Sequence, residues 1–300
     1  MTLVTVLAAV AVAAGGGAGG WRTDASLPLP RTEVAAAVGG GQVVVAGGYL
    51  ADGTTTGRVD LYDPAAGTWR KGPALPRAVN HASAATLDGE AVVVGGYVAR
   101  GTPSTLAVAL EQGRWRSLPP LAAPRAAAAT AVLGSRLYVV GGVTNGGLAR
   151  RMLVYDGRGW KRLPGPTPRQ HLAAAAAGGR IYAIAGRVAG ADTNLAIVES
   201  WAPGETRWRR EPPLPEPRGG TGAAAVAGRI VSIGSESQQK TSGAVFAFDL
   251  RRRRWTRLHD LPTPRHGLGV VVLGGRVHAI GGGPEPGLTV TGANESLRIG

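Results

Sequence analysis

Residues 124–160 decide the fold of this chain, and they read PRAAAATAVLGSRLYVVGGVTNGGLARRMLVYDGRGW. A run of small residues, Ala126–Val132, follows the Pro-Arg pair, and a second apolar run, Leu137–Val140, leads into Gly-Gly. After a variable loop come a third apolar run, Met152–Tyr155, and a tight turn that leads to Trp160. Short apolar runs that alternate with turn-forming residues predict strands, so this stretch predicts a unit of four strands.

Three markers of this stretch recur along the chain in a fixed order. The first is tryptophan, at steps of 48, 46, 45, 48 and 47 residues: Trp21, Trp69, Trp115, Trp160, Trp208 and Trp255. The second is a Pro-Arg pair: Pro30-Arg31, Pro76-Arg77, Pro124-Arg125, Pro168-Arg169, Pro217-Arg218 and Pro264-Arg265. The third is a Gly-Gly pair, degenerate in two units: Gly47-Gly48, Gly95-Gly96, Gly141-Gly142, Ala185-Gly186, Gly234-Ser235 and Gly281-Gly282. A fixed period of roughly 20 to 50 residues is the signature of a repeat architecture.

Six copies of a four-stranded unit predict an all-β protein with six propeller blades. One such sheet cannot bury both of its faces, so neighbouring sheets must stack around an axis. The small residues suit innermost strands that crowd around a channel, and each Trp is large enough to fill the gap where blades diverge. Trp21-Arg22-Thr23 has the character of a fourth strand and Asn294–Ile299 that of a third. We therefore expect the Trp21 segment to complete the last blade, which leaves no free edge in the ring.

The order Gly-Gly, then Tyr-Asp, then Trp at a spacing of about 47 residues resembles the kelch repeat. Tyr-Asp occurs at Tyr62-Asp63 and Tyr155-Asp156, and the resemblance covers residues 21–300. The Gly-His and Trp-Asp signatures of WD40 repeats are missing. The resemblance implies a single rigid propeller domain that binds ligands on one face. That face is formed by the loops after Gly-Gly and the loops around Pro-Arg.

Aligning the six units puts a set of polar residues on that face, and it is rich in units one, two and four and bare in unit three. The second unit has two extra residues between Pro-Arg and Gly-Gly, so its register is open by that amount. No catalytic residue is assigned. The candidates for ligand contact are Glu33, Tyr49, Asn80, His81, Tyr97, Gln170, His171, Arg187, Glu236 and His266.

Two kinds of chemistry are open to these residues. His81, His171 and His266 lie in alternate blades, and three imidazoles can hold a divalent metal with an open position. Their offsets from the repeat arginine differ, at four, two and one residues, so we expect no metal and no other cofactor. Glu33 and Glu236 beside Arg187 could instead bind a sugar acid, or a peptide carboxylate with hydroxyls. A carboxylate there could also act as a general acid or base.

The resemblance implies a non-catalytic module that binds a protein or glycan partner through the loop face. The alternative is a cofactor-free sugar mutarotase, because kelch propellers include N-acetylneuraminate epimerase, which resembles this chain in blade number. In that case Glu33 or Glu236 would transfer the proton, and Arg187 would hold the substrate carboxylate. A copper radical oxidase like galactose oxidase is excluded, because its cofactor needs a cysteine and the chain has none.

A net charge of +14 raises a third possibility, a polyanion-binding surface. Only Lys71, Lys161 and Lys240 are lysines, and abundant Arg, Ala and Gly are typical of a GC-rich coding sequence. No basic stripe is interleaved with stacking aromatics, so we do not expect nucleic acid as a partner. The cluster Arg251–Arg254 is interpreted as a hairpin tip. Steep weakening of binding with salt would be the mark of a polyanion site.

The first twenty residues differ from the rest and form the other predicted segment, beside a propeller domain at 21–300. Leu3–Ala14 is apolar apart from Thr5, and it is too short for the roughly 20 residues that span a bilayer. It resembles the apolar region of a secretory signal, although no Lys or Arg precedes it. We therefore expect a secreted or cell-envelope protein, monomeric and without a transmembrane segment in its mature chain.

Overall fold

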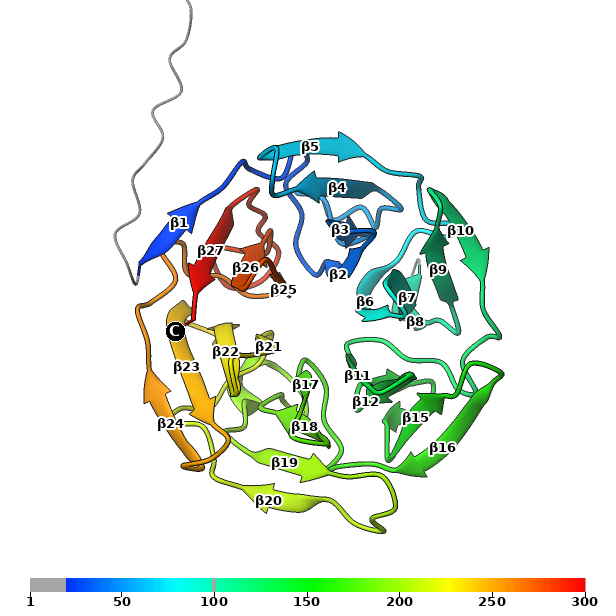
Figure 1. The fold of residues 1–300 in the computed structure, drawn as a ribbon, viewed down its shortest axis with the longest axis vertical. Helices are drawn as coiled ribbons and strands as arrows, with labels where there is room; N and C mark the ends of the chain where they lie inside the picture. Colours follow the sequence, from blue (N-terminus) through cyan, green and yellow to red (C-terminus); the bar gives the residue numbers. More distant parts are fainter. Residues whose placement is uncertain (1–19, 99–100, 300) are drawn as a thin grey trace, which may run out of the picture.

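The computed structural model describes residues 20–98 and 101–299. These residues form six antiparallel sheets arranged as blades around a central axis (Figure 1), which confirms the predicted all-β, six-bladed propeller. No α-helix occurs in these two ranges, and the one helical turn in them is a 3-10 turn at Ala191–Thr193. The export segment expected at residues 1–20 lies outside the described residues except for Gly20.

Blades 1 to 3 follow the chain from the centre outward. Blade 1 consists of β2 (Ala35–Gly39), β3 (Gln42–Ala46), β4 (Val59–Asp63) and β5 (Thr68–Lys71). Blade 2 consists of β6 (Asn80–Leu87), β7 (Glu90–Val98), β9 (Ala107–Glu111) and β10 (Arg114–Ser117), with β8 (Thr102–Pro103) paired to β7. Blade 3 consists of β11 (Ala129–Leu133), β12 (Arg136–Val140), β15 (Arg151–Tyr155) and β16 (Trp160–Pro164), and its loop forms the small hairpin β13 (Val143–Thr144) and β14 (Gly147–Leu148).

Blades 4 to 6 repeat this order. Blade 4 consists of β17 (Ala173–Ala177), β18 (Arg180–Ile184), β19 (Val198–Trp201) and β20 (Arg209–Glu211). Blade 5 consists of β21 (Gly222–Val226), β22 (Arg229–Glu236), β23 (Thr241–Asp249) and β24 (Arg254–Arg257), with the predicted hairpin tip just before β24. Blade 6 consists of β25 (Gly269–Leu273), β26 (Arg276–Ile280), β27 (Asn294–Arg298) and β1 (Trp21–Thr23).

The ring is closed as the sequence predicts, because the first described strand is the outermost strand of the last blade. Strand β1 pairs antiparallel with β27, with Trp21 opposite Leu297. The Asp24 amide donates to the Asn294 carbonyl at 2.8 Å, which extends the pairing by one more bond. Figure 1 shows the two segments side by side at the rim of the disc. Closure of this kind leaves the last blade with the same four strands as the others.

The repeat tryptophans hold neighbouring blades together through a hydrogen bond as well as by packing. Each lies partly buried against the apolar core between its own blade and the preceding one. Each indole N–H donates to a backbone carbonyl at a distance of 2.7–2.9 Å. The acceptors are the carbonyls of His259, Ala25, Pro73, Pro119, Pro164 and Pro212. A half-buried Trp with a bonded N–H suits a boundary that is apolar on one side and wet on the other.

The repeat arginines are mostly interior residues, so they add little to the basic surface. Five of the six are buried, namely Arg31, Arg125, Arg169, Arg218 and Arg265, whereas Arg77 is exposed. In blades 1, 4 and 6 an acid from the third strand pairs with the guanidinium: Asp60, Glu199 and Glu295. Burial lowers the pKa of Arg125, which has no acidic partner among the described residues, to about 10. These arginines are part of the scaffold, as expected.

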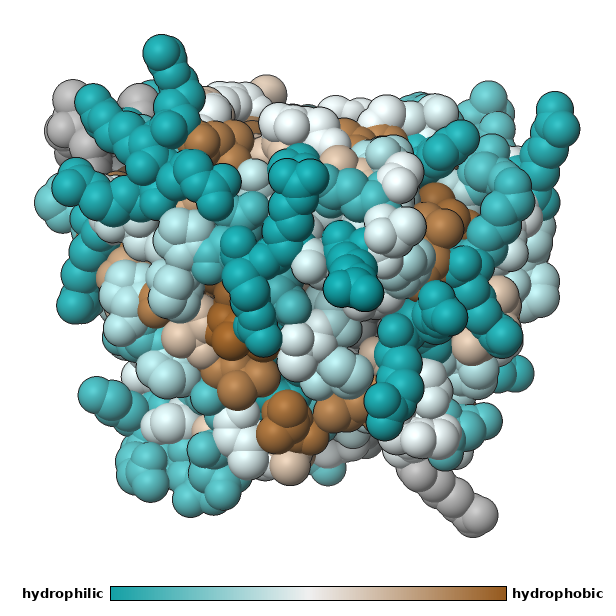
Figure 2. Space-filling view, turned by 90° about the horizontal axis from the view of Figure 1, so that it is seen from below, coloured by the Kyte–Doolittle hydropathy of each residue, from teal (hydrophilic) through white to brown (hydrophobic). Residues whose placement is uncertain are grey.

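The side of the disc drawn in Figure 2 is predominantly hydrophilic. On this side hydrophobic residues form only small patches between polar side chains. Val188 and Leu288 are the large hydrophobic residues most exposed in the described ranges, at 44% and 49%. No helix in those ranges is long and apolar enough to cross a membrane.

Candidate functional site

The loops after Pro-Arg bring one residue from each blade to the same level of the central channel. We call these six residues the channel ring: Glu33, His81, Ala127, His171, Gly220 and Gly267. All six have a positive φ, between 48° and 67°. In five of them the backbone N–H donates to the carbonyl of the ring residue in the preceding blade, at 2.9–3.0 Å. The Val34 amide donates to the Gly267 carbonyl at 3.3 Å and completes the circle of main-chain hydrogen bonds.

The side chains of the channel ring make the mouth of the channel lopsided. Glu33, His81 and His171 are polar and large, whereas the other three positions are Ala or Gly. The space among the six measures about 90 Å³, and a second space of about 120 Å³ lies among the small residues of the innermost strands. His81 stands four residues after Arg77, whereas the ring residue of every other unit stands two residues after its arginine. The two extra residues of unit two therefore lie between Arg77 and His81, and His81 occupies the same ring position as the others.

Glu33 is the central acidic group of the mouth. Its Oε2 lies 3.3 Å from His81 Nε2, and its Oε1 lies 3.4 Å from His266 Nδ1. Burial alone favours the neutral carboxyl, but the His81 and His266 imidazoles outweigh it and hold the pKa of Glu33 below its ordinary value. Glu33 is therefore ionised at neutral pH.

His81 has one ring nitrogen fixed by a hydrogen bond outside the channel. Its Nδ1 lies 2.7 Å from Asn80 Oδ1. The Asn80 amide nitrogen donates to Thr55 Oγ1 at 2.7 Å and to the Tyr97 carbonyl at 3.4 Å, so Oδ1 is the atom that accepts. Burial lowers the pKa of His81, and the charge of Glu33 only partly offsets this. His81 Nδ1 therefore donates to Asn80, and Nε2 is the nitrogen that faces Glu33.

Aromatic rings surround His81. The rings of Tyr49, Tyr97 and His171 stand edge-on to it, at centroid distances of 5.8, 5.5 and 4.9 Å. Burial and the neighbouring His81 lower the pKa of His171 well below its ordinary value. His171 Nδ1 is buried and has no hydrogen-bond partner among the described residues. The neighbouring Gln170 turns away, since its side-chain amide donates to the Ala189 carbonyl at 3.4 Å.

His266 links the two carboxylates of the face. Its Nε2 lies 3.4 Å from Glu236 Oε2 and 3.2 Å from the Glu285 carbonyl. Burial lowers the pKa of His266, but Glu33 and Glu236 more than offset this, so the net shift is upward. Glu236 Oε1 also pairs with the Arg187 guanidinium at 2.8 Å, and both side chains are nearly buried. The guanidinium charge is therefore balanced inside the protein.

The structure brings nine of the ten candidate residues into one cluster, and Gln170 alone faces elsewhere. The histidines do not surround one point, because the ring nitrogens of His266 face Glu33 and Glu236. Instead, one ligand atom each from Glu33, His81 and His171 lie within 4.8 Å of one another. Sequence reasoning missed this grouping. The available signal was the shared offset of Glu33 and His171, two residues after the repeat arginine.

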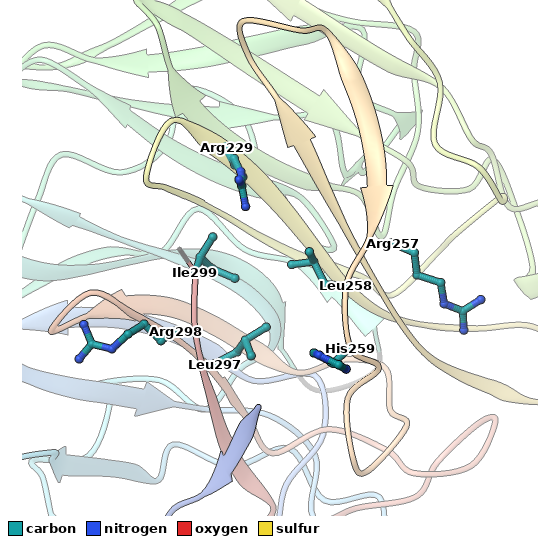
Figure 3. Close-up of a pocket in the computed structure, with 7 residues that line it drawn as sticks. All are labelled: Arg229, Arg257, Leu258, His259, Leu297, Arg298 and Ile299. Atoms are coloured by element: carbon teal, nitrogen blue, oxygen red, sulfur yellow. The ribbon is translucent and has the colours of Figure 1, made fainter. Parts of the chain in front are cut away.

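A larger cavity of about 530 Å³ lies at the rim, next to the strand that closes the ring (Figure 3). Its lining combines apolar and basic residues: Arg229, Arg257, Leu258, His259, Leu297, Arg298 and Ile299. His259 is exposed here, and its backbone carbonyl accepts a hydrogen bond from the Trp21 indole N–H. Arg257 is paired with Asp260. The polar groups of this cavity do not converge on one point, so the channel mouth is the better candidate site.

Comparison with known proteins gives matches along most of the chain. The family described as KLHDC2/KLHL20/DRC7 Kelch-repeats domain matches residues 81–282, and the Kelch motif matches residues 30–76. The solved structure of YjhT superposes with a TM-score of 0.77 at 16% identity, covering 91% of this chain and 96% of that one. At this identity the likeness shows the fold alone.

Two curated relatives are similar over shorter stretches. The human Kelch repeat and BTB domain-containing protein 13 is 36% identical over 105 residues, which are 33% of this chain and 22% of that protein. An F-box/kelch-repeat protein of Arabidopsis thaliana is 42% identical over 57 residues, 18% of this chain and 15% of that protein. The match thus covers less than a quarter of either relative.

Proposed function

The chain belongs to the KLHDC2/KLHL20/DRC7 Kelch-repeat family, and we propose that it is a non-catalytic module that binds a protein or glycan partner at the channel mouth. The observation that carries the proposal is the lopsided channel ring. Glu33, which is nearly buried and ionised, shares the ring with two imidazoles and with three positions occupied only by Ala or Gly. The small residues leave room for a group that a partner inserts.

The volume of the space at the channel ring favours a partner that inserts a single chemical group over a small molecule that is fully enclosed. Pockets for small molecules measure roughly 300–1,000 Å³. The space at the channel ring is about 90 Å³, which suits a hydroxyl, amide or ammonium group and not a sugar ring. Glu33 accepts hydrogen bonds, so the inserted group would be a donor. Tyr49 and Tyr97, beside His81, offer amphipathic rings for the rest of the contact.

The mutarotase alternative has weaker support from the same geometry. It needs Arg187 to hold a substrate carboxylate, but Arg187 is paired with Glu236 and nearly buried. It also needs Glu33 or Glu236 to transfer a proton. A general base works best with a pKa near the working pH, but the pKa of Glu33 is lowered, and Glu236 is held by Arg187 and His266. Anomeric exchange of acidic sugars, followed by NMR, would revive this alternative if the wild type exceeded the buffer rate and Glu33→Gln did not.

The binding proposal is tested with arrays of glycans and peptides probed with purified protein. We expect a defined subset to bind the wild type and His259→Ala, which changes an exposed residue outside the site. The same subset should lose binding to Glu33→Gln. Equal binding by all three proteins would place the contact elsewhere and refute the proposal.

We also propose secretion or a cell-envelope location, from the apolar run at residues 3–14, and cell fractionation tests it.

A further inference from the structure

We propose that Glu33, His81 and His171 form a binding site for a divalent first-row transition-metal ion at the channel ring. One ligand atom from each residue lies within 4.8 Å of the other two. Two imidazole nitrogens with one carboxylate oxygen are a ligand set for Zn²⁺ or Fe²⁺ in sites that keep open positions. This inference differs from the sequence-based expectation that the chain binds no metal. It also goes beyond the proposed function, because that function is the binding of a protein or glycan partner and this site would bind a metal ion.

The three ligands are held by the main chain and not by flexible side-chain packing. Each stands in the channel ring with φ of 54°, 50° and 51°. Hydrogen bonds connect them through the backbone, from the His81 amide to the Glu33 carbonyl and from His171 to His81 by way of Ala127. A preorganised scaffold of this kind fixes the distances between ligands before an ion arrives.

The contact between Glu33 and His81 suits a bound cation. His81 Nδ1 donates to Asn80 Oδ1, so Nε2 is the nitrogen turned toward the channel. It lies 3.3 Å from Glu33 Oε2. A carboxylate oxygen and an imidazole nitrogen at that distance attract a cation, either a proton or a metal ion. A metal ion in place of the proton would bond to both atoms.

His171 provides a second, independent sign. Its Nδ1 is buried and has no hydrogen-bond partner among the described residues. A buried polar atom without a partner is costly, and it points to an ion or a water that completes it. The ring of His171 lies 4.9 Å from that of His81, centroid to centroid, so its nitrogens are within reach of the same point.

The groups behind the ligands orient them in the way that metal sites require. Asn80 Oδ1 accepts a hydrogen bond from His81 Nδ1, so Nε2 is the nitrogen available to an ion. His266 contacts Oε1 of Glu33 and leaves Oε2 turned toward His81. Such outer contacts fix the tautomer and the direction of ligands, and their loss commonly weakens metal binding about 10- to 100-fold. Asn80 and His266 are thus positioning residues.

Room remains for the other positions of a coordination sphere. The space among the channel-ring residues is about 90 Å³, and a water occupies roughly 30 Å³ of liquid. Two or three waters, or one group from a partner, would complete four to six ligands. The small residues make that room: Ala127 lies between His81 and His171, and Gly220 and Gly267 lie between His171 and Glu33.

The test uses the untagged full chain, treated with EDTA, and titrates it with Co²⁺ and Zn²⁺ alone. We expect one Co²⁺ per chain, with visible absorption bands, and an increase in the melting temperature with Zn²⁺. His171→Ala should weaken binding by about 100-fold or more, and Asn80→Ala by about 10-fold or more. His171→Ala is a mild change for the fold, because Ala127 occupies the same position in blade 3 at φ 48°. His259→Ala, outside the site, should bind like the wild type.

Two outcomes overturn the proposal. The first is the lack of saturable binding by the wild type, which would mean that a proton on His81 separates it from Glu33. The second is equal binding by wild type and His171→Ala, or a loss in His259→Ala, which would place the ion on the outer surface. The melting curve without metal shows whether each variant is folded. Because no partner is present, a negative result here leaves the proposed partner binding standing, and the reverse also holds.

Discussion

Removal of one buried repeat arginine should destabilise the whole propeller, and Arg169→Ala is the sharpest test. The Arg169 side chain is inaccessible to solvent and pairs with Glu199. Its guanidinium also donates to three backbone carbonyls: Ala185 at 2.6 Å, Thr167 at 2.8 Å and Ala183 at 3.0 Å. Alanine would leave these carbonyls without that donor and would leave the Glu199 carboxylate buried without its cation.

The expected size follows from that uncompensated charge. Breaking a buried ion pair by deleting one partner costs about 3–5 kcal/mol. The double variant Arg169→Met, Glu199→Leu should lose less than the single variant, because no lone buried charge remains. Arg77→Ala is the matched control at the same repeat position. Arg77 is exposed, so its loss should change the free energy of unfolding by no more than about 0.5 kcal/mol.

Urea unfolding followed by tryptophan fluorescence measures these differences, since the six repeat tryptophans report on every boundary between blades. The comparison holds if the slope of free energy against urea is the same for all variants. A loss below about 1 kcal/mol in Arg169→Ala would refute the reasoning, because such losses are ordinary for surface changes. A double variant less stable than the single one would do the same.

Three further predictions concern the scaffold. Gly142→Ala should lower the free energy of unfolding in urea by about 1–3 kcal/mol or more, because a Cβ at this position, with φ 85°, would lie 2.6 Å from the Ala126 carbonyl oxygen. Gly134→Ala, at φ 60° with open space around it, should lower it less, and the reverse order would contradict this prediction. Trp21→Phe should lower the free energy of unfolding by about 0.5–1.5 kcal/mol, because the indole N–H bond to the His259 carbonyl is lost, and no change in the melting temperature would show that the bond is dispensable. Burial lowers the pKa of His278 below 6.5; Asp24 opposes this shift, and Arg276 and Arg22 add to it. The unfolded state therefore binds a proton more readily than the folded state, so the stability from this group is full above about pH 6.5 and declines below it. Between pH 7.5 and 5.5 the melting temperature of His278→Gln should fall less than that of the wild type.

The sequence was sufficient for the fold because the markers repeat where the geometry repeats. The pairing of Trp21 with Leu297 followed from counting strands in the first and last units. The partners of the repeat arginines did not follow, since an acid stands at the third-strand position facing the arginine only in blades 1, 4 and 6. In blade 5 the equivalent position is Phe246, whose ring lies 4.6 Å from the Arg218 guanidinium carbon.

The sequence predicted which residues lie on the loop face, but it did not predict which of their side chains contact one another. Glu33 and His171 share an offset from the repeat arginine and therefore a place in the channel ring. His266 is one residue earlier than the ring residue Gly267, and its side chain lies between Glu33 and Glu236. Which nitrogen of His81 carries a proton depends on Asn80, and a hydrogen bond between adjacent side chains leaves no trace in the spacing of motifs.

The circle of main-chain hydrogen bonds around the axis has a consequence for how such a disc can change over generations. Amides and carbonyls make every link, so no link depends on which side chain projects inward. Any residue that tolerates a positive φ could be exchanged at one blade without loosening its neighbours. Six positions then surround the channel axis, and each can change its side chain independently of the others. New binding specificity can arise by one substitution at a time while the fold is unchanged.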